Sequence, residues 1–273
     1  MKRAVLLRFH KAPLVCRSRV SLLRQLNPGV PVYGLFGGKR VPAALLERLV
    51  GLDGVYLSRR SDRWNWQHGD FALAAWYRAE GSKLDFDVLH VVEWDLLLVA
   101  PLEALYASVP RGTVGLTALT PVAELEGEWT WLRKAEPRRE WEALLAIARE
   151  KWGYDGKPYG CLAAGPSFPR AFLEAYAAAD PPALGNDELR VPLFAQILGF
   201  ELADTRLRGP WRGEREHELF HLRAHEIELT TIRAELAKPD GARAFHPVRS
   251  RLDGEMIFGE LPPRPAEARQ VSA

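Results

Sequence analysis

Three common signatures are missing from this sequence, and each absence narrows its class. Only two of the 273 residues are cysteines, Cys16 and Cys161, so a disulfide-stapled scaffold is excluded. No run of about 18 apolar residues occurs, which argues against a membrane-spanning helix. The charge is nearly balanced, with 37 Lys and Arg against 35 Asp and Glu and a net charge of +2, so broad nucleic-acid binding is not expected.

The start of the chain also lacks the succession of basic, apolar and small residues that marks a secretion signal. Together with the scarce cysteines, this absence predicts a cytoplasmic protein. Peripheral contact with a membrane stays open, and so does the oligomeric state.

What the sequence does contain is the composition of an ordinary globular protein, with 47% hydrophobic and 26% charged residues. Its length fits one large domain or two small ones. Apolar runs of strand length alternate with helical patterns through the first half, which predicts the α/β class with a mostly parallel sheet flanked by helices. The expected strands cover residues 4–9, 30–35, 54–57, 88–92 and 113–116, and the expected helices cover 13–26, 42–50, 67–79 and 101–108.

The second half is less regular. Helices are expected at 140–152, 168–179, 187–198 and 214–238, with a strand at 200–204. Residues 244–249 follow the last of these helices. Residues 117–137 are interpreted as a tryptophan-bearing loop, residues 153–165 as a glycine-rich segment, and residues 261–273 as a loose, proline-rich tail. Because no linker separates the two halves, we expect a single continuous domain over residues 1–260.

Glu93-Trp94-Asp95 follows directly on the apolar run at 88–92. In an open α/β sheet, ligands collect beyond the carboxyl ends of the strands, which is where this triplet would lie. Two carboxylates on such a turn suit Mg²⁺ or Mn²⁺, which prefer oxygen ligands and often join a protein carboxylate to substrate phosphates. A solvent-exposed acidic turn would explain the triplet as well.

This triplet and the residues that lead to it, from Asp85 to Val92, resemble the Asp-X-Asp region of the GT-A superfamily of nucleotide-sugar glycosyltransferases. The resemblance implies a GT-A-like fold in which residues 1–116 bind the nucleotide sugar and residues 117–260 bind the acceptor. It also implies a UDP- or GDP-sugar donor, a saccharide or other hydroxyl acceptor, and Mn²⁺ or Mg²⁺ as cofactor. Glu93 takes the place of the family's first aspartate, and both Glu93 and Asp95 become predicted metal ligands.

The same resemblance assigns further residues to the donor site. His246 stands where many GT-A enzymes return a C-terminal histidine to the metal, although a lone histidine is more often a surface or hydrogen-bonded residue. Arg249 would face the diphosphate, for which a guanidinium is well suited. The other predicted donor contacts are Phe9, His10, Lys11, Arg63, Asp70 and Trp94, with Arg59, Arg60 and His68 as further candidates. A solvated polar loop would explain those near residues 59–70 equally well.

Asn186-Asp187-Glu188 opens the helix expected at 187–198, and Gly199-Phe200 follows that helix. Acidic side chains at a helix N-terminus are favoured by the helix dipole and by unpaired backbone N–H groups, so capping is a complete structural explanation. The spacing also resembles the second GT-A signature, an acidic pair that heads a helix ending in glycine and an aromatic residue. That resemblance implies that Asp187 or Glu188 is the general base of an inverting transfer, and the choice between them stays open.

Two Trp-X-Trp pairs, Trp64 with Trp66 and Trp129 with Trp131, fall in segments expected to be loops. They are either lids on the core or surfaces for sugar rings, whose C–H faces pack well on indole. Residues 159–165 resemble the small-residue floor of the GT-A acceptor site, where glycine lets a substrate approach the backbone closely.

His217-Glu218-Leu219-Phe220-His221 keeps a second enzymatic hypothesis open. Two histidines four residues apart on one helix, with a glutamate beside the first, are typical of zinc peptidases and related zinc hydrolases. The charged residues around the motif argue against this hypothesis, because the helix of a zinc peptidase is usually apolar and buried. A catalytically silent sugar-binding or scaffold protein is the third alternative.

Overall fold

The computed structural model describes residues 1–209, 218–222 and 224–259, and within them seven strands form one sheet. The strand order is β3-β2-β1-β4-β7-β6-β8. Only β7 runs against the other described strands of this sheet, so the predicted α/β class with a mostly parallel sheet is confirmed. The strands are β1 (Arg3–Phe9), β2 (Val32–Phe36), β3 (Val55–Leu57), β4 (Val88–Glu93), β6 (Val114–Pro121), β7 (Tyr159–Pro169) and β8 (Leu202–Asp204).

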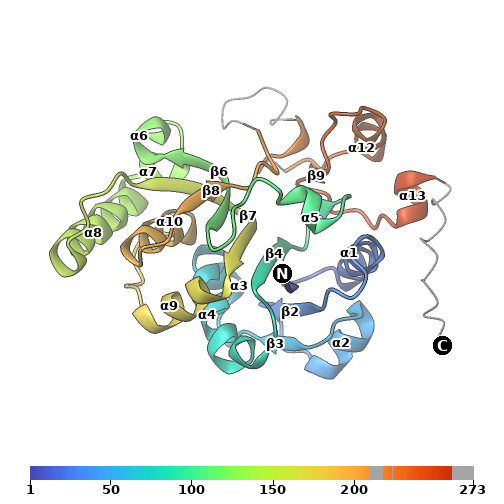
Figure 1. Ribbon diagram of the computed structural model, residues 1–273, viewed down its shortest axis with the longest axis horizontal. Helices are drawn as coiled ribbons and strands as arrows, with labels where there is room; N and C mark the ends of the chain where they lie inside the picture. The colour runs from blue at the N-terminus through green and yellow to red at the C-terminus, as the bar shows by residue number, and fades with distance from the viewer. Residues whose placement is uncertain (210–217, 223, 260–273) are drawn as a thin grey trace, which may run out of the picture.

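Strand β1 illustrates why helices cover both faces of the sheet. Successive side chains of a strand point to opposite faces, and those of β1 are apolar on both. Ala4 and Leu6 share a core cluster with side chains of α4 (Gly69–Ala79), α8 (Ala135–Trp152), α9 (Arg170–Ala179) and α10 (Asp187–Ile197). Val5 and Leu7 share a second cluster with side chains of α1 (Pro13–Leu26) and α2 (Ala43–Val50). The helices therefore form two groups, one for each face (Figure 1).

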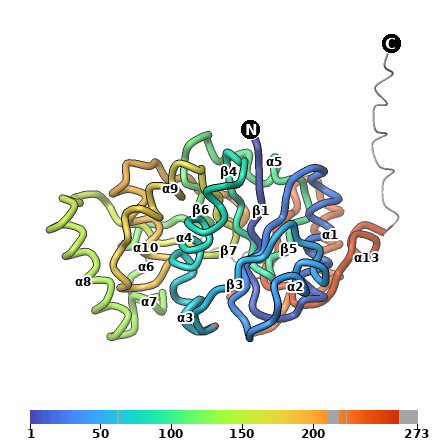
Figure 2. The backbone as a smooth tube through the Cα atoms, turned by 90° about the horizontal axis from the view of Figure 1, so that it is seen from below, coloured from blue at the N-terminus to red at the C-terminus, as the bar shows by residue number. Residues whose placement is uncertain are grey.

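A small second sheet connects the C-terminal region to the end of β4. In it, β5 (Leu97–Leu98) pairs antiparallel with β9 (Ala244–Phe245), which brings the residues after β9 beside the turn that follows β4. Helix α13 (Gly254–Phe258) lies beside α1, where Leu22 and Ile257 share a core cluster (Figure 2). Further short helices are α3 (Asp62–Gln67), η1 (Gly81–Lys83), α5 (Leu102–Leu105), α6 (Val122–Leu125), α7 (Thr130–Arg133) and α12 (Leu229–Leu236).

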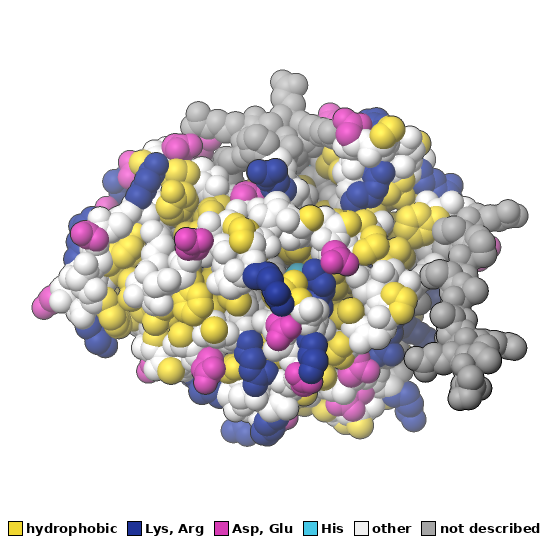
Figure 3. Space-filling view, viewed as in Figure 1, with side chains coloured by type: hydrophobic (Ala, Val, Ile, Leu, Met, Phe, Trp, Pro, Cys, Tyr) yellow, Lys and Arg dark blue, Asp and Glu magenta, His cyan; other side chains and the backbone are white. Residues whose placement is uncertain are grey.

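The surface carries charges of both signs close together. On the face drawn in Figure 3, the Lys and Arg side chains outside the grey atoms are interspersed with Asp and Glu. This mixture agrees with the small net charge of the sequence. Across the part of the chain that the structure describes, no helix combines the length and the apolar character that crossing a membrane requires.

In the middle of the chain, one strand was not predicted and one expectation is wrong. The glycine-rich segment at 153–165 contributes most of β7, because pairing with β4 on one side and β6 on the other outweighs the low strand propensity of its small residues. The tryptophan-bearing segment at 117–137 contains the end of β6 together with α6 and α7, and is not a loop. Leu125 and Leu132 of these short helices are buried in the core, which explains why the segment is ordered into turns of helix.

The single helix expected at 214–238 is also wrong. Helix α12 begins only at Leu229, and Phe220 instead forms an isolated bridge with His246. The backbone N–H of His221 donates to the carbonyl oxygen of His246 at 2.7 Å, so this stretch pairs as extended chain. His221 is therefore not helical, which removes the one-helix geometry that the zinc-hydrolase hypothesis needs. His217 and the tail at 261–273 lie outside the described residues.

Candidate active site

The carboxyl ends of the parallel strands open into a cleft of about 700 Å³. Side chains from the ends of β1 and β4, the start of α10 and the segment after β9 meet there. Asp70 does not line the cleft, and neither do the further candidates Arg59, Arg60 and His68. The predicted residues that do line it are Phe9, His10, Lys11, Arg63, Glu93, Trp94, Asp95, Asp187, Glu188, His246 and Arg249.

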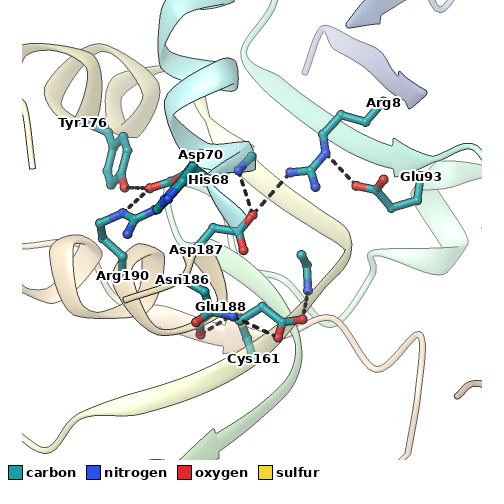
Figure 4. Close-up of polar contacts among 12 residues, drawn as sticks. Arg8, His68, Asp70, Glu93, Cys161, Tyr176, Asn186, Asp187, Glu188 and Arg190 are labelled. Carbon is teal, nitrogen blue, oxygen red and sulfur yellow. Dashed lines mark hydrogen bonds and ion pairs between the residues drawn. The ribbon is translucent and has the colours of Figure 1, made fainter. Parts of the chain in front are cut away.

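Arg8 connects two of the acidic groups of the cleft. Residues 8 and 93 are direct partners in the β1–β4 pairing, and Arg8 Nε lies 2.7 Å from Glu93 Oε1 (Figure 4). Its Nη1 lies 3.6 Å from Asp187 Oδ2 at the start of α10. A Cβ on Gly69 would stand 2.0 Å from this same Nη1, so a glycine at the start of α4 leaves the space that the guanidinium occupies. The sequence reading missed Arg8, although a charged residue inside an otherwise apolar, buried strand is a usable signal.

Asp95 and His246 form a second polar pair at the end of β4. Asp95 Oδ1 and His246 Nε2 are 3.4 Å apart, and the backbone N–H of Val248 donates to the carbonyl oxygen of Asp95 at 2.8 Å. Burial of Asp95 tends to raise its pKa, but hydrogen bonding and charge from His246 and Arg249 bring the pKa below its usual value. On its other side, His246 Nδ1 lies 2.8 Å from the carbonyl oxygen of His221. Since a carbonyl only accepts, Nδ1 is the donor, and Nε2 is the nitrogen that faces Asp95.

The predicted set of three metal ligands is not assembled. Within residues 1–209, 218–222 and 224–259, no three or more His, Cys, Asp or Glu side chains are grouped so that they could hold a metal ion. The carboxylate of Glu93 is turned to the guanidinium of Arg8. Asp95 and His246 still fit one cation as a pair, since two ligands at about 2.1 Å and a right angle lie about 3 Å apart.

Asp187 and Glu188 occupy the first turn of α10 and are both buried. Asp187 Oδ2 accepts a hydrogen bond from the backbone N–H of Gly69 at 3.2 Å and also faces Arg8, whereas Oδ1 makes no hydrogen bond to the described residues. Burial raises the pKa of Asp187 to about 6, against the opposing charge of Arg8. One oxygen of Asp187 is therefore held and the other is left for a ligand of the cleft.

Glu188 differs from Asp187 because both of its oxygens are held. Oε1 accepts from the backbone N–H of Ala163 at 3.0 Å, and Oε2 accepts from Trp131 Nε1 at 2.7 Å. Oε2 also accepts from Asn186 Nδ2 at 3.3 Å (Figure 4). Burial, with a contribution from the charge of Asp187, raises its pKa to about 7 in spite of these three donors. Glu188 thus ties the start of α10 to β7 and α7.

Asp70 lies outside the cleft and supports it through buried hydrogen bonds. Its carboxylate accepts two hydrogen bonds from Arg190, Nε to Oδ2 and Nη2 to Oδ1, both at 2.7 Å, and a third from the hydroxyl of Tyr176. Arg190 also donates to the carbonyl oxygens of Leu184 and Gly185, at 2.8 and 2.9 Å. This wholly buried arginine therefore joins the first turn of α4, which supplies Gly69, to the segment that leads into Asp187. Of the further candidates, His68 contacts Arg190 through Nδ1 at 3.1 Å, and Arg59 and Arg60 do not line the cleft.

Aromatic side chains form the end of the cleft next to Glu188. Trp129 is buried and packs over Gly160 of β7, where an added Cβ would stand 2.5 Å from the indole. Trp131 makes the hydrogen bond to Glu188, and its ring centre lies 5.3 Å from that of Trp66 in α3. Trp64 packs instead against His68 at 5.0 Å and does not line the cleft. Of the two Trp-X-Trp pairs, Trp66, Trp129 and Trp131 thus line the cleft.

No family model matches the sequence, and no curated protein matches it. Among solved structures, the chain is similar to the apo form of the bifunctional glycosyltransferase WbbM, with 12% identity and a TM-score of 0.45, over 89% of this chain and 45% of that one. It is similar to apo mouse xyloside xylosyltransferase 1, with 12% identity and a TM-score of 0.38, over 74% of this chain and 84% of that one.

A further similar structure is galactosyltransferase LgtC in complex with donor and acceptor sugar analogs, with 9% identity and a TM-score of 0.38, over 73% of this chain and 72% of that one. Solved glycosyltransferases are thus among the structural neighbours of this chain. The chain spans less than half of the WbbM chain. At these identities a shared activity does not follow, so the question of function rests on the residues of the cleft.

Proposed function

We propose that this protein is a glycosyltransferase that moves a sugar from a nucleoside diphosphate donor to an acceptor hydroxyl with inversion at the anomeric carbon. The observation that carries the proposal is the composition of one cleft at the carboxyl ends of the strands. It combines positively charged groups suited to a diphosphate with a buried carboxylate whose pKa is raised to about 6 and whose Oδ1 makes no hydrogen bond to the described residues.

The diphosphate end consists of Lys11, Arg249 and the Asp95–His246 pair. Lys11 follows β1 and lies over the ring of Trp94, with its Nζ 4.8 Å from the ring centre. Arg249 Nε is 3.7 Å from Asp95 Oδ2, which keeps a guanidinium beside the carboxylate. Guanidinium and ammonium groups bind phosphate oxygens strongly, so these two side chains would hold the donor's phosphates.

Asp95 and His246 are the residues that would hold Mn²⁺ or Mg²⁺. Such an ion, bound jointly by the pair and by the donor's phosphates, would stabilise negative charge on the departing nucleoside diphosphate. The hydrogen bond between His246 Nδ1 and the His221 carbonyl oxygen orients the imidazole so that Nε2 points to Asp95.

Asp187 is the better candidate for the general base. Both oxygens of Glu188 are engaged by three protein donors, whereas Asp187 engages only Oδ2. In the proposed step, Asp187 takes the proton of the acceptor hydroxyl, the acceptor oxygen bonds to the anomeric carbon, and the bond from that carbon to the donor's phosphate oxygen breaks with its electron pair leaving on the diphosphate. A pKa near 6 leaves the carboxylate ionised at neutral pH while keeping it basic enough to act.

A thermal-shift screen of UDP, GDP, CMP and dTDP derivatives with and without Mn²⁺ tests the proposal. A ligand at 100 times its Kd stabilises a folded protein by about 2.7 kcal/mol, which is readily detected. We expect one nucleotide class to stabilise the protein, more strongly with Mn²⁺, and its sugar conjugate to be turned over. One-dimensional NMR of the product's anomeric proton then reports inversion or retention.

Failure of every nucleotide to stabilise the protein would contradict the proposal. Nucleotide binding without any turnover would favour the catalytically silent sugar-binding alternative instead. The zinc-hydrolase alternative predicts tight zinc that is lost in His221→Ala and retained in Asp95→Ala, which is the opposite of what the Asp95–His246 pair predicts.

A further inference from the structure

Two exposed apolar side chains line the cleft, and one of them belongs to an aromatic pair. Trp66 is 64% exposed, the highest value among the large hydrophobic residues that the structure describes, and Leu222 is 63% exposed. An indole exposed on the wall of a cleft is a common sign of a binding surface, because burying its large apolar area against a ligand is favourable. The ring of Trp66 meets that of Trp131 at 47°, so the two indoles form a corner and not a flat stack.

A series of contacts connects the Asp95 turn to this aromatic corner. Asp95 shares its turn with Glu93, Glu93 contacts Arg8, and Arg8 contacts Asp187. The candidate base is therefore linked through Arg8 to the turn that carries Asp95.

Beyond the candidate base, the next side chain in the helix is Glu188, and Glu188 accepts the indole N–H of Trp131 at 2.7 Å. Trp131 in turn contacts Trp66. This hydrogen bond and this ring contact join the aromatic corner to the first turn of α10, which carries the candidate base.

In an inverting transfer, the acceptor approaches the anomeric carbon from the side opposite the diphosphate and gives its proton to the base. The hydrogen bond from Trp131 to Glu188 keeps the aromatic corner next to the turn of α10 that carries Asp187, so an acceptor bound at the corner would lie near the candidate base. A pyranose ring fits a corner of this kind, because its apolar C–H face packs on an indole while its hydroxyl groups stay available for polar neighbours. Ala163 and Ala164 also line the cleft and leave room beside the corner for a ring to enter.

We propose that Trp66 and Trp131 form the acceptor subsite and that the acceptor is a saccharide bound through the C–H face of a pyranose ring. The role as acceptor subsite rests on the proposed glycosyltransferase function, whereas the binding of a saccharide at this corner does not. Trp131 has a second task, since its N–H fixes Glu188 and with it the first turn of α10. Trp66 has no comparable structural contact with α10, so it is the residue to alter.

The test uses saturation-transfer NMR with a mixture of the methyl α- and β-pyranosides of glucose, galactose, mannose and N-acetylglucosamine. Wild type is compared with Trp66→Ala, with Trp66→Phe, which keeps a flat aromatic face, and with Leu45→Ala, which removes a 43% exposed side chain of α2 outside the cleft. UDP and GDP with Mn²⁺ are titrated into each variant in parallel, and circular dichroism confirms that each variant is folded.

We expect at least one glycoside to receive saturation on the ring protons of one face. Its affinity should fall by about tenfold in Trp66→Ala, recover in part in Trp66→Phe and stay at the wild-type level in Leu45→Ala. The nucleotide Kd of Trp66→Ala should stay within about twofold of wild type, because the proposal assigns the indole to the acceptor and not to the donor.

Three results would overturn the inference: no glycoside binds, glycoside binding is the same in Trp66→Ala, or Trp66→Ala loses the nucleotide, which would make the indole a nucleobase platform. The experiment distinguishes failure of the saccharide subsite from failure of the glycosyltransferase proposal. Glycoside binding that depends on Trp66 without binding of any nucleotide supports the saccharide subsite and contradicts the glycosyltransferase. Nucleotide turnover together with glycoside binding that is unchanged in Trp66→Ala supports the glycosyltransferase and contradicts the subsite.

Discussion

The ion pair between Asp70 and Arg190 should be among the most costly polar interactions to break in this protein. Neither side chain is more than 1% exposed, and two hydrogen bonds of 2.7 Å join them. Removing one partner of a buried pair leaves the other charge without compensation, which costs about 3–5 kcal/mol. Against a typical total stability of about 5–15 kcal/mol, Arg190→Met should lose a large part of the free energy of unfolding.

The loss should also appear as heat lability and as damage to the cleft. For a chain of this size, about 4 kcal/mol corresponds to a fall in Tm of roughly 10 °C. Arg190 additionally holds the carbonyl oxygens of Leu184 and Gly185, just before the first turn of α10. Arg190→Met should therefore weaken nucleotide turnover even at temperatures where the variant is folded.

A double-mutant cycle with urea unfolding, followed by circular dichroism, measures the coupling between the two side chains. The cycle uses Asp70→Asn, Arg190→Met and the double variant. The matched control is the Arg138–Glu142 pair on α8, whose partners are 56% and 58% exposed and whose coupling should be only about 0.3–0.5 kcal/mol. If Arg190→Met cost less than about 1 kcal/mol, or if both pairs gave the same coupling, the reasoning from burial would be refuted.

Three further outcomes follow from the carboxylates of the cleft. Asp187→Asn should lower the rate of transfer by about 10²- to 10⁴-fold, and the wild-type rate should fall below pH 6 as Asp187 is protonated; a profile without this acid limb would contradict its role as base. Because burial raises the pKa of Glu188 from its usual 4.5 to about 7, the native state keeps a proton that the unfolded chain loses, and the free energy of unfolding should fall as pH rises between these values. Glu188→Gln should flatten that decline, by up to about 3 kcal/mol in urea unfolding, and an unchanged slope would assign the decline to another group. Asp95→Asn should abolish the Mn²⁺-dependent part of the nucleotide thermal shift while the exposed Asp85→Asn keeps it, and equal shifts in both variants would remove Asp95 from the metal site.

The sequence was informative where a segment's own residues determine its structure. β1 and β4 are continuous apolar runs because both faces of the sheet are covered, and their predicted positions agree with the structure to within a residue or two. β7 escaped prediction because its glycines and alanines have low strand propensity, and its pairing partners lie far away in the sequence. The break in the helix expected at 214–238 has the same origin, since the backbone of residues 220–221 pairs with His246.

The residues of the site also divide into those that the sequence identified and those that only the packing reveals. A rule about strand ends was enough to locate the Glu93-Trp94-Asp95 turn, whereas Asp187 and Glu188 were singled out by the resemblance to the second GT-A signature. Arg190 was missed because its partner Asp70 is 120 residues away, and no local pattern reports such a pair. Asp70 was assigned to the donor for the same reason, since only the packing of α4 against α10 makes its burial apparent.

Glutamate in the first position of the triplet now has a physical explanation. Because β1 and β4 pair in register at residues 8 and 93, the longer side chain of Glu93 brings Oε1 to 2.7 Å from Arg8 Nε. The same guanidinium reaches Asp187, so one positive group compensates the strand end and the start of the helix that carries the candidate base. Asp95 is left to pair with His246 and Arg249. The position that the family resemblance assigned to a metal ligand thus links two walls of the cleft, and a net charge of +2 for the whole chain conceals how closely its charges are matched there.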